Sequence, residues 1–147
     1  MTTIPVEIGA EVRFAKTFAE SDFYLFSGIS GDFDKAHINE EYMKTTVFGR
    51  RIAHGLLVLS LSSTTASLMS SRYSSTDSAF TPVSAGYDRV RFIKPVFIGD
   101  TITAVYRIAE IDHERSRTRG QLEMTNQHGE TVCVAEHSLA WLPRDTG

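Results

Sequence analysis

A long stretch without helix-breaking residues lies in the middle of the chain, and it constrains the fold more than any other feature. From His54 to about Ser71 the only glycine is Gly55, near the start, and there is no proline. Apolar and small residues recur there at i, i+4, i+7 and i+11: Leu57, Leu61, Thr64 and Leu68. We expect one central helix, whose Ser and Thr hydroxyls bond back to carbonyls four residues earlier. So apolar a helix must be covered by the rest of the chain.

Four segments of high β propensity follow the central helix. They are Ala85–Phe92, Thr101–Asp112, Arg117–Asn126 and Thr131–Leu142. Short turn-forming links separate them, and consecutive strands joined by short links favour antiparallel pairing. The order predicts an α+β fold in which an antiparallel sheet wraps around the long central helix. Large aromatic side chains are expected in its core: Phe92, Phe97 and Trp141.

The first half of the chain supplies short elements and polar loops. Glu11–Phe18 is expected to be extended, and Glu20–Ser30 to form a helix with Ser21 as its N-cap. A loop over Ser30–Lys35 and a short capped helix over Asn39–Met43 complete this half. The polar loops therefore precede the central helix directly.

Length and charge narrow the function classes. A chain of 147 residues has room for one domain, residues 1–147, and a net charge of −3 gives no general attraction to nucleic acid or anionic membranes. The longest apolar run, Gly55–Leu61, is too short to cross a membrane, and the N-terminus has no features of a secretory signal. The single cysteine, Cys133, lies in an alternating strand and is interpreted as a buried hydrophobe. These features predict a cytoplasmic location.

Two short features can carry chemistry. Asp32 and His37 lie five residues apart on a polar loop, where a carboxylate and an imidazole can orient and deprotonate a water molecule. Gly55 begins the central helix, and a backbone N–H at such a position can bind a developing oxyanion. Taken singly, the Asp32–His37 spacing is more simply explained by a turn aspartate and a histidine near a helix, and Gly55 by a simple helix cap. No His or Cys spacing is typical of a metal site, so no metal is predicted.

Together, three stretches resemble the MaoC-like dehydratase family, which contains the (R)-specific enoyl-CoA hydratases. They are residues 26–37, 48–56 and 91–101. The resemblance implies a hot-dog fold that works as a dimer with its substrate tunnel near the subunit interface. It also implies a hydro-lyase of fatty acid metabolism that needs no cofactor. Such an enzyme adds water across the C2=C3 bond of a trans-2-enoyl thioester to give the (R)-3-hydroxyacyl thioester, or catalyses the reverse dehydration.

The resemblance also implies roles for individual residues. Asp32 and His37 hold the water, and the Gly55 N–H receives the enolate-like oxygen. Ser63 aligns with a serine that helps to hold the site in the family, although a helix serine bonded to its own helix explains it equally well.

The family signature, Gly-Asp-x-Asn-Pro-x-His, is only partly matched. Gly31, Asp32 and His37 are retained, whereas Asp34 replaces the Asn and Lys35 replaces the Pro. Lys35 lacks the fixed φ of proline, so the loop is expected to be less constrained. These changes keep two alternatives open: a hot-dog acyl-CoA thioesterase, and a non-catalytic acyl-thioester-binding subunit.

The implied substrate and assembly give two further expectations. The acyl carrier is coenzyme A or acyl carrier protein, and the candidate phosphate ligands are Arg50, Arg51, Arg72, Arg89, Arg91 and Lys94. The segments Ala85–Phe92 and Thr131–Leu142 have no interior proline to protect a sheet edge. Edge-to-edge pairing is therefore expected to join two copies into a homodimer or a higher homo-oligomer.

Overall fold

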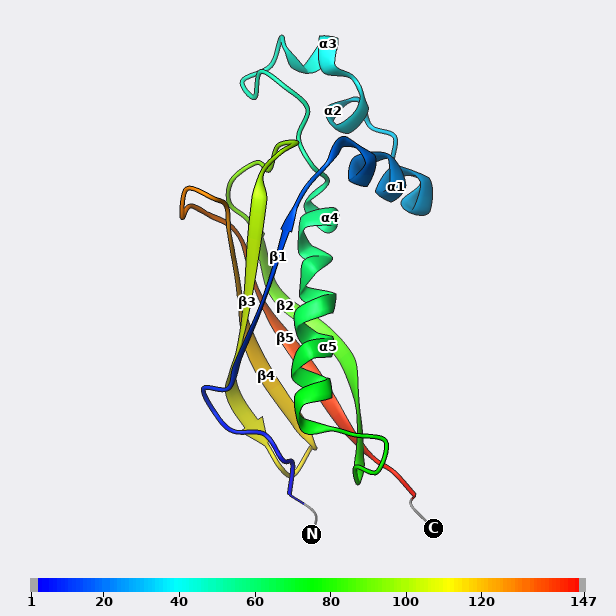
Figure 1. Cartoon of the computed structure of the whole chain (residues 1–147), viewed down its shortest axis with the longest axis vertical. Helices are drawn as coiled ribbons and strands as arrows, with labels where there is room; N and C mark the ends of the chain where they lie inside the picture. Colours follow the sequence, from blue (N-terminus) through cyan, green and yellow to red (C-terminus); the bar gives the residue numbers. More distant parts are fainter. Residues whose placement is uncertain (1–2, 146–147) are drawn as a thin grey trace.

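The computed structural model describes residues 3–145, and it contains one sheet and one long helical rod (Figure 1). The elements are β1 (Glu11–Thr17), α1 (Glu20–Ser30), α2 (Lys35–Ile38), α3 (Glu40–Met43), α4 (Gly55–Leu59), α5 (Leu61–Tyr73), β2 (Phe80–Phe92), β3 (Thr101–Asp112), β4 (Arg117–Thr125) and β5 (Thr131–Pro143). Helices α4 and α5 run along the sheet, and α1 to α3 lie together beyond one end of it (Figure 1). Within residues 3–145, no helix combines the length and apolar character needed to cross a bilayer.

The five strands form a single sheet in the order β1-β3-β4-β5-β2, with every neighbouring pair antiparallel. The expected α+β fold with an antiparallel sheet along a long helix is confirmed. The expectation for the edges was partly wrong, because β5 lies between β4 and β2 while the two edges are β1 and β2. Strand β2 also begins at Phe80, five residues earlier than expected, and includes Pro82. An edge strand tolerates proline because one side of its backbone needs no partner.

The central helix was expected as one unbroken element, but it tightens at Ser60, between α4 and α5. The Ser60 N–H donates to both Leu56 O, at 2.9 Å, and Leu57 O, at 3.2 Å. The Ser60 hydroxyl also donates to Leu57 O, at 2.5 Å. The hydroxyls of Ser62 and Thr65 likewise bond to carbonyls three residues earlier rather than the expected four. Such side-chain bonds to backbone carbonyls compete with the regular hydrogen bonds of the helix and produce the irregularity at Ser60.

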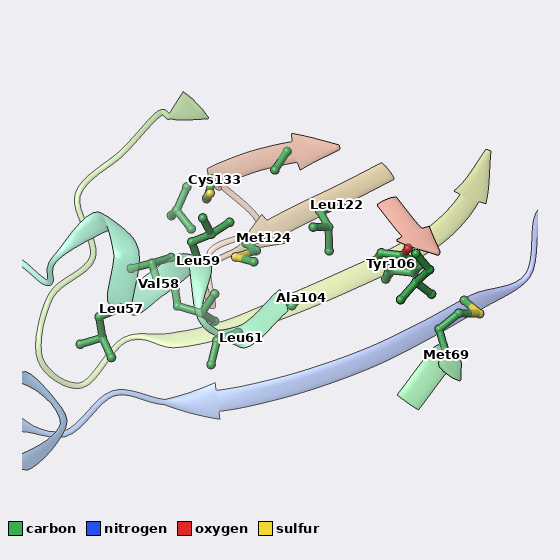
Figure 2. Close-up of a cluster of buried hydrophobic side chains, with 14 of the residues drawn as sticks. Leu57, Val58, Leu59, Leu61, Met69, Ala104, Tyr106, Leu122, Met124 and Cys133 are labelled. Atoms are coloured by element: carbon green, nitrogen blue, oxygen red, sulfur yellow. The ribbon is translucent and has the colours of Figure 1, made fainter. Parts of the chain in front are cut away.

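The core lies between the inner face of the sheet and the helices α4 and α5 (Figure 2). Alternate residues of β3 point inward and are almost fully buried: Ile102, Ala104, Tyr106 and Ile108. Trp141 is buried as expected, and burial raises the pKa of the Cys133 thiol to about 11, so that it stays protonated. The expectation for Phe92 was wrong, because its ring is 53% exposed on the edge strand β2. Phe97 is half-buried.

The segment before the central helix is shaped by aspartate caps. Helix α1 spans the expected residues, but Ser21 is not its N-cap. The N-cap is Ala19, whose N–H donates to Asp22 Oδ2 at 2.8 Å. Asp34 caps α2, since its Oδ1 accepts from the Ala36 N–H at 2.9 Å. These caps fix the chain that carries Asp32 and His37.

Candidate active site

Asp32 and His37 lie side by side beyond the start of the central helix. Asp32 Oδ2 is 3.8 Å from His37 Nε2, which is close enough for an ion pair but longer than a direct hydrogen bond. The Asp32 side chain is half exposed, whereas the His37 side chain is largely buried. Asp32 on the loop and His37 on α2 are therefore brought together, with Asp32 facing solvent and His37 facing inward.

The orientation of the His37 ring follows from its second nitrogen. His37 Nδ1 lies 2.8 Å from the carbonyl oxygen of Ile52. Because a carbonyl only accepts, Nδ1 carries the proton in the neutral ring, and Nε2 keeps its lone pair. The nitrogen that faces Asp32 is thus the one that can accept a proton.

Gly55 and His37 line the same cavity, which has a volume of about 380 Å³. Its wall is mainly apolar: Phe48, Ile52, Val58, Phe92, Val96 and Val132. As the first residue of α4, Gly55 has an N–H with no acceptor inside the helix. A Cβ on Gly55 would lie 2.7 Å from Phe92 Cε2, so any larger residue at this position requires the Phe92 ring to move. An acyl chain is the kind of group that such a cavity can bury.

Ser63 does not reach this cavity within the chain. It is exposed on α5 and lines a separate groove of about 210 Å³ with Ser67, Ser84 and Leu139. Eight residues of helix rise about 12 Å, which separates it from Gly55. The cavity is therefore lined by two of the four predicted site residues, His37 and Gly55. Asp32 lies next to it through its contact with His37, and Ser63 lies beside the edge strand β2.

His54 is a site residue that the sequence analysis did not single out. Its ring is buried and stacks on the His37 ring, with centroids 3.7 Å apart and planes at 24°. His54 Nε2 lies 3.1 Å from the backbone oxygen of Asp32. The signal in the sequence was only its place beside Gly55, because the stacking arises from tertiary structure.

Asp32, His37 and His54 each present a ligand atom, and these atoms lie within 4.8 Å of one another. The two rings are nearly parallel, however, so their in-plane lone pairs do not converge on one ion. His37 Nδ1 and His54 Nε2 are also occupied by carbonyl oxygens. The geometry suits an acid–base pair better than a metal centre.

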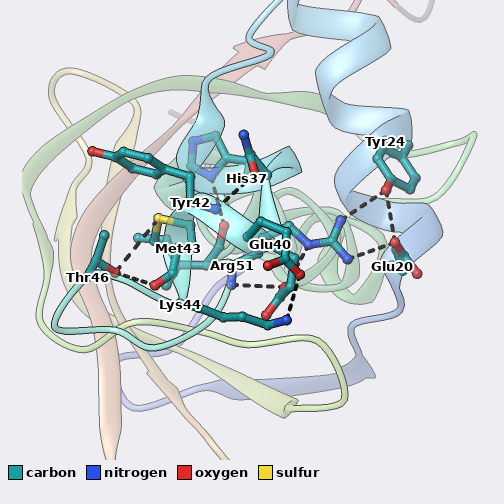
Figure 3. A network of polar contacts seen from close by, with 12 residues as sticks. Glu20, Tyr24, His37, Glu40, Tyr42, Met43, Lys44, Thr46 and Arg51 are labelled. Atoms are coloured by element: carbon teal, nitrogen blue, oxygen red, sulfur yellow. Dashed lines mark hydrogen bonds and ion pairs between the residues drawn. The ribbon is translucent and has the colours of Figure 1, made fainter.

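Arg51 ties the helices around the site together (Figure 3). Its guanidinium is 2.7 Å from Glu20 Oε1 on α1 and 3.0 Å from Glu40 Oε2 on α3. It also donates to the Tyr24 hydroxyl at 3.0 Å. Arg51 was expected among the phosphate ligands, and this was wrong, because its buried charge is already paired. Instead it anchors the chain next to Ile52, the residue that orients His37.

The replaced signature residues keep the local geometry. Asp34 accepts from the Ala36 N–H, as the side-chain oxygen of an asparagine can. Lys35 is the first residue of α2, the helical position that proline prefers, and its ammonium lies 4.7 Å from the centre of the Tyr42 ring. The substitutions thus preserve the loop that holds Asp32 and His37.

An antiparallel sheet along one long helix defines the hot-dog fold, which the solved structures of R-hydratases share with this chain. The chain belongs to the MaoC-like domain family, whose model matches residues 4–132.

Individual relatives show the same relationship. The chain is 37% identical over 110 residues to the (R)-specific enoyl-CoA hydratase of Rhodospirillum rubrum, covering 75% of this chain and 71% of that protein. It is 30% identical over 139 residues to the 3-hydroxybutyryl-CoA dehydratase of Methylorubrum extorquens, covering 95% and 82%. The structure of the (R)-hydratase from A. caviae superposes with a TM-score of 0.80 at 26% identity, covering 94% of this chain and 98% of that one.

Proposed function

We propose that this chain is an (R)-specific enoyl-CoA hydratase or 3-hydroxyacyl-CoA dehydratase, a hydro-lyase that acts on trans-2-enoyl thioesters. The observation that carries the proposal is an apolar cavity lined by both His37 and Gly55, with Asp32 Oδ2 3.8 Å from His37 Nε2. The names of the relatives from R. rubrum and M. extorquens support the same reaction.

The proposed mechanism assigns one task to each group. The acyl chain enters the cavity, and the Gly55 N–H donates to the thioester oxygen, which gains negative charge as the enolate forms. Asp32 and His37 hold the water between them, and His37 Nε2 takes one proton as the water oxygen bonds to C3. A proton is then delivered from the pair to C2 on the same face. The net reaction adds only water across the C2=C3 bond, so it requires no cofactor.

Two basic residues are proposed to contact the carrier of the acyl group. Lys94 lines the cavity and pairs with Glu130, and Arg50 lies over the Phe97 ring, 3.8 Å from its centre. We propose that both contact phosphates of coenzyme A or of the acyl carrier protein's prosthetic arm. The single thiol, Cys133, is free and buried, which supports the expected cytoplasmic location.

We further propose that residues 1–147 act as one domain in a homodimer formed through β2. This edge strand is exposed along most of its length. Exposed apolar side chains on it and on the adjoining strand β5 are Val83, Tyr87, Phe92 and Leu142. Pairing β2 with its copy would satisfy the open backbone groups and cover this surface. The groove that contains Ser63 borders β2, so a partner copy would lie against it.

The assembly is tested by light scattering at low micromolar concentration. A mass of twice 16.4 kDa or a higher multiple is expected. Val83→Asp on β2 should yield monomers, whereas Ala15→Asp on the opposite edge strand β1 should not. An active 16.4 kDa monomer would contradict the proposed dimer.

The activity is tested with a panel of trans-2-enoyl thioesters carried by coenzyme A or acyl carrier protein. A hydratase removes the absorbance of the conjugated enoyl thioester without releasing thiol. A thioesterase releases free thiol, and a binding subunit retains the thioester unchanged. The three outcomes separate the proposal from both alternatives that the sequence left open.

A further inference from the structure

His54 is buried directly behind Asp32 and His37. Only 3% of the residue is exposed. Phe26 packs against its ring with centroids 4.7 Å apart, and Phe23 meets it edge-on at 6.4 Å. The remaining face carries the stacked His37 ring at 3.7 Å. The His54 ring is therefore held in place by its neighbours and supports the His37 ring by stacking.

The hydrogen bonds of His54 reach the other member of the pair. Its Nε2 lies 3.1 Å from the Asp32 backbone oxygen and 3.2 Å from Ser27 Oγ. A carbonyl only accepts, so Nε2 carries the proton and donates to Asp32. His54 Nδ1 is buried without a hydrogen-bond partner. One side chain thus supports His37 through its face and Asp32 through its edge.

The charge state of His54 suits this role. Burial lowers the pKa of His54, and the neighbouring His37 lowers it further, while the Asp32 backbone bond opposes both effects. The titratable groups facing the ring are Asp32 and His37; on the α1 side it meets Phe23, Phe26 and Ser27. A neutral ring behind His37 does not oppose the positive charge that His37 gains when it takes a proton.

We propose that His54 is a positioning residue that sets the separation between Asp32 Oδ2 and His37 Nε2. The expected effect of His54 on the rate rests on the proposed hydratase function, whereas its effect on the distance between Asp32 and His37 does not. The face of the His54 ring fixes the position of the His37 ring stacked on it, and the His54 Nε2–H fixes the backbone at Asp32. A displacement of about 1 Å between reacting groups is enough to lower a rate by up to about 100-fold.

Two substitutions separate the two contacts. His54→Phe keeps a ring beneath His37 but removes the donor to Asp32. His54→Gln keeps an N–H donor near the position of Nε2 but removes the ring. His137→Gln is the matched control, because His137 is equally buried but contacts Ser84 and Tyr106 rather than the site.

Kinetics give the first readout. Both His54 variants are expected to lower kcat by about 10- to 100-fold with little change in KM, and His137→Gln is expected to leave kcat unchanged. His54→Phe added to Asp32→Asn should cost nothing further, because its effect passes through Asp32. Losses that multiply, or equal losses in His137→Gln, would overturn the proposal in favour of a general structural role.

Crystal structures of the same variants give a readout without substrate. The Asp32 Oδ2–His37 Nε2 distance is 3.8 Å in the wild-type chain. In both His54 variants we expect this distance to lengthen, or one of the two side chains to become disordered. An unchanged separation in both would overturn the positioning role, whatever activity the protein has. A wild-type chain that fails to hydrate enoyl thioesters, with a separation that does depend on His54, would instead refute only the proposed function.

Discussion

His37 Nδ1 lies 2.8 Å from the carbonyl oxygen of Ile52, a residue that leads into the central helix. This contact joins α2, which contains His37, to the segment that leads into α4. It leaves Nε2 as the only basic nitrogen of the neutral His37 ring. The reacting end of the site is thereby fixed relative to Gly55, three residues after Ile52.

The first prediction concerns the pair itself. Asp32→Asn and His37→Ala should each lower the hydration rate by about 10²- to 10⁴-fold, because each removes a group that orients or deprotonates water. Steady-state kinetics measure the loss, and circular dichroism checks the fold. His113→Ala, at an exposed turn, is the control. Near-normal turnover in either site variant would refute the assignment.

The second prediction concerns the altered signature. Asp34→Asn combined with Lys35→Pro should keep the enzyme active on straight-chain enoyl-CoAs, and should stiffen the loop. An asparagine oxygen can cap α2 as Asp34 does, and proline is compatible with the first helical position that Lys35 occupies. Kinetics of the double variant test this. Loss of activity would instead place Asp34 or Lys35 in substrate recognition.

The third prediction concerns the contact between Gly55 and Phe92. Gly55→Ala places a methyl group 2.7 Å from Phe92 Cε2, so the ring must move. Because that ring is half exposed, its displacement should change the free energy of unfolding by less than about 1 kcal/mol. The cavity changes shape, however, and kcat/KM should fall.

Adding Phe92→Leu to Gly55→Ala provides the control, because the shorter side chain leaves room for the methyl group. Partial recovery of kcat/KM is expected in the double variant. If Gly55→Ala alone behaves as wild type in both kinetics and urea unfolding, Phe92 does not shape the acyl cavity.

The fourth prediction concerns stability against acid. Burial lowers the pKa of His137 to about 4 in the folded chain, from 6.5 for an exposed imidazole. The unfolded chain therefore binds this proton more tightly, and the contribution is fully present above pH 6.5 and is lost as the pH falls toward 4. The loss is about 1.4 kcal/mol for each pH unit within that window.

Urea unfolding at pH 7, 6 and 5 measures this dependence. His137→Gln should flatten it, although His54, whose pKa burial also lowers, retains a contribution of the same sign. A variant with the same pH dependence as the wild type would show that His137 does not carry the effect.

Regular patterns made the fold predictable. The unbroken helical stretch and the alternating strands report burial directly, so α5, β3 and β4 lie close to where the sequence places them. The start of β2 was missed because Pro82 resembles a loop signal, and its edge position is a tertiary fact. Phe92 was misplaced for the same reason, since an apolar residue on an edge strand need not face the core.

The site was predictable only where residues are near in sequence or match a family signature. The sequence selected Asp32 and His37 in this way, and they lie 3.8 Å apart in the folded chain. The contribution of His54 depends on a ring stacked across 17 residues of chain, and Arg51 pairs with Glu20, 31 residues away. Contacts of this kind leave no periodic signal in a sequence.

The most direct test of the central claim is the product formed from a trans-2-enoyl-CoA by the purified wild-type chain, resolved by chiral chromatography. The account predicts the (R)-3-hydroxyacyl-CoA with the thioester intact, and its loss in Asp32→Asn. Free coenzyme A with the double bond retained, the (S) product, or unchanged substrate would contradict it.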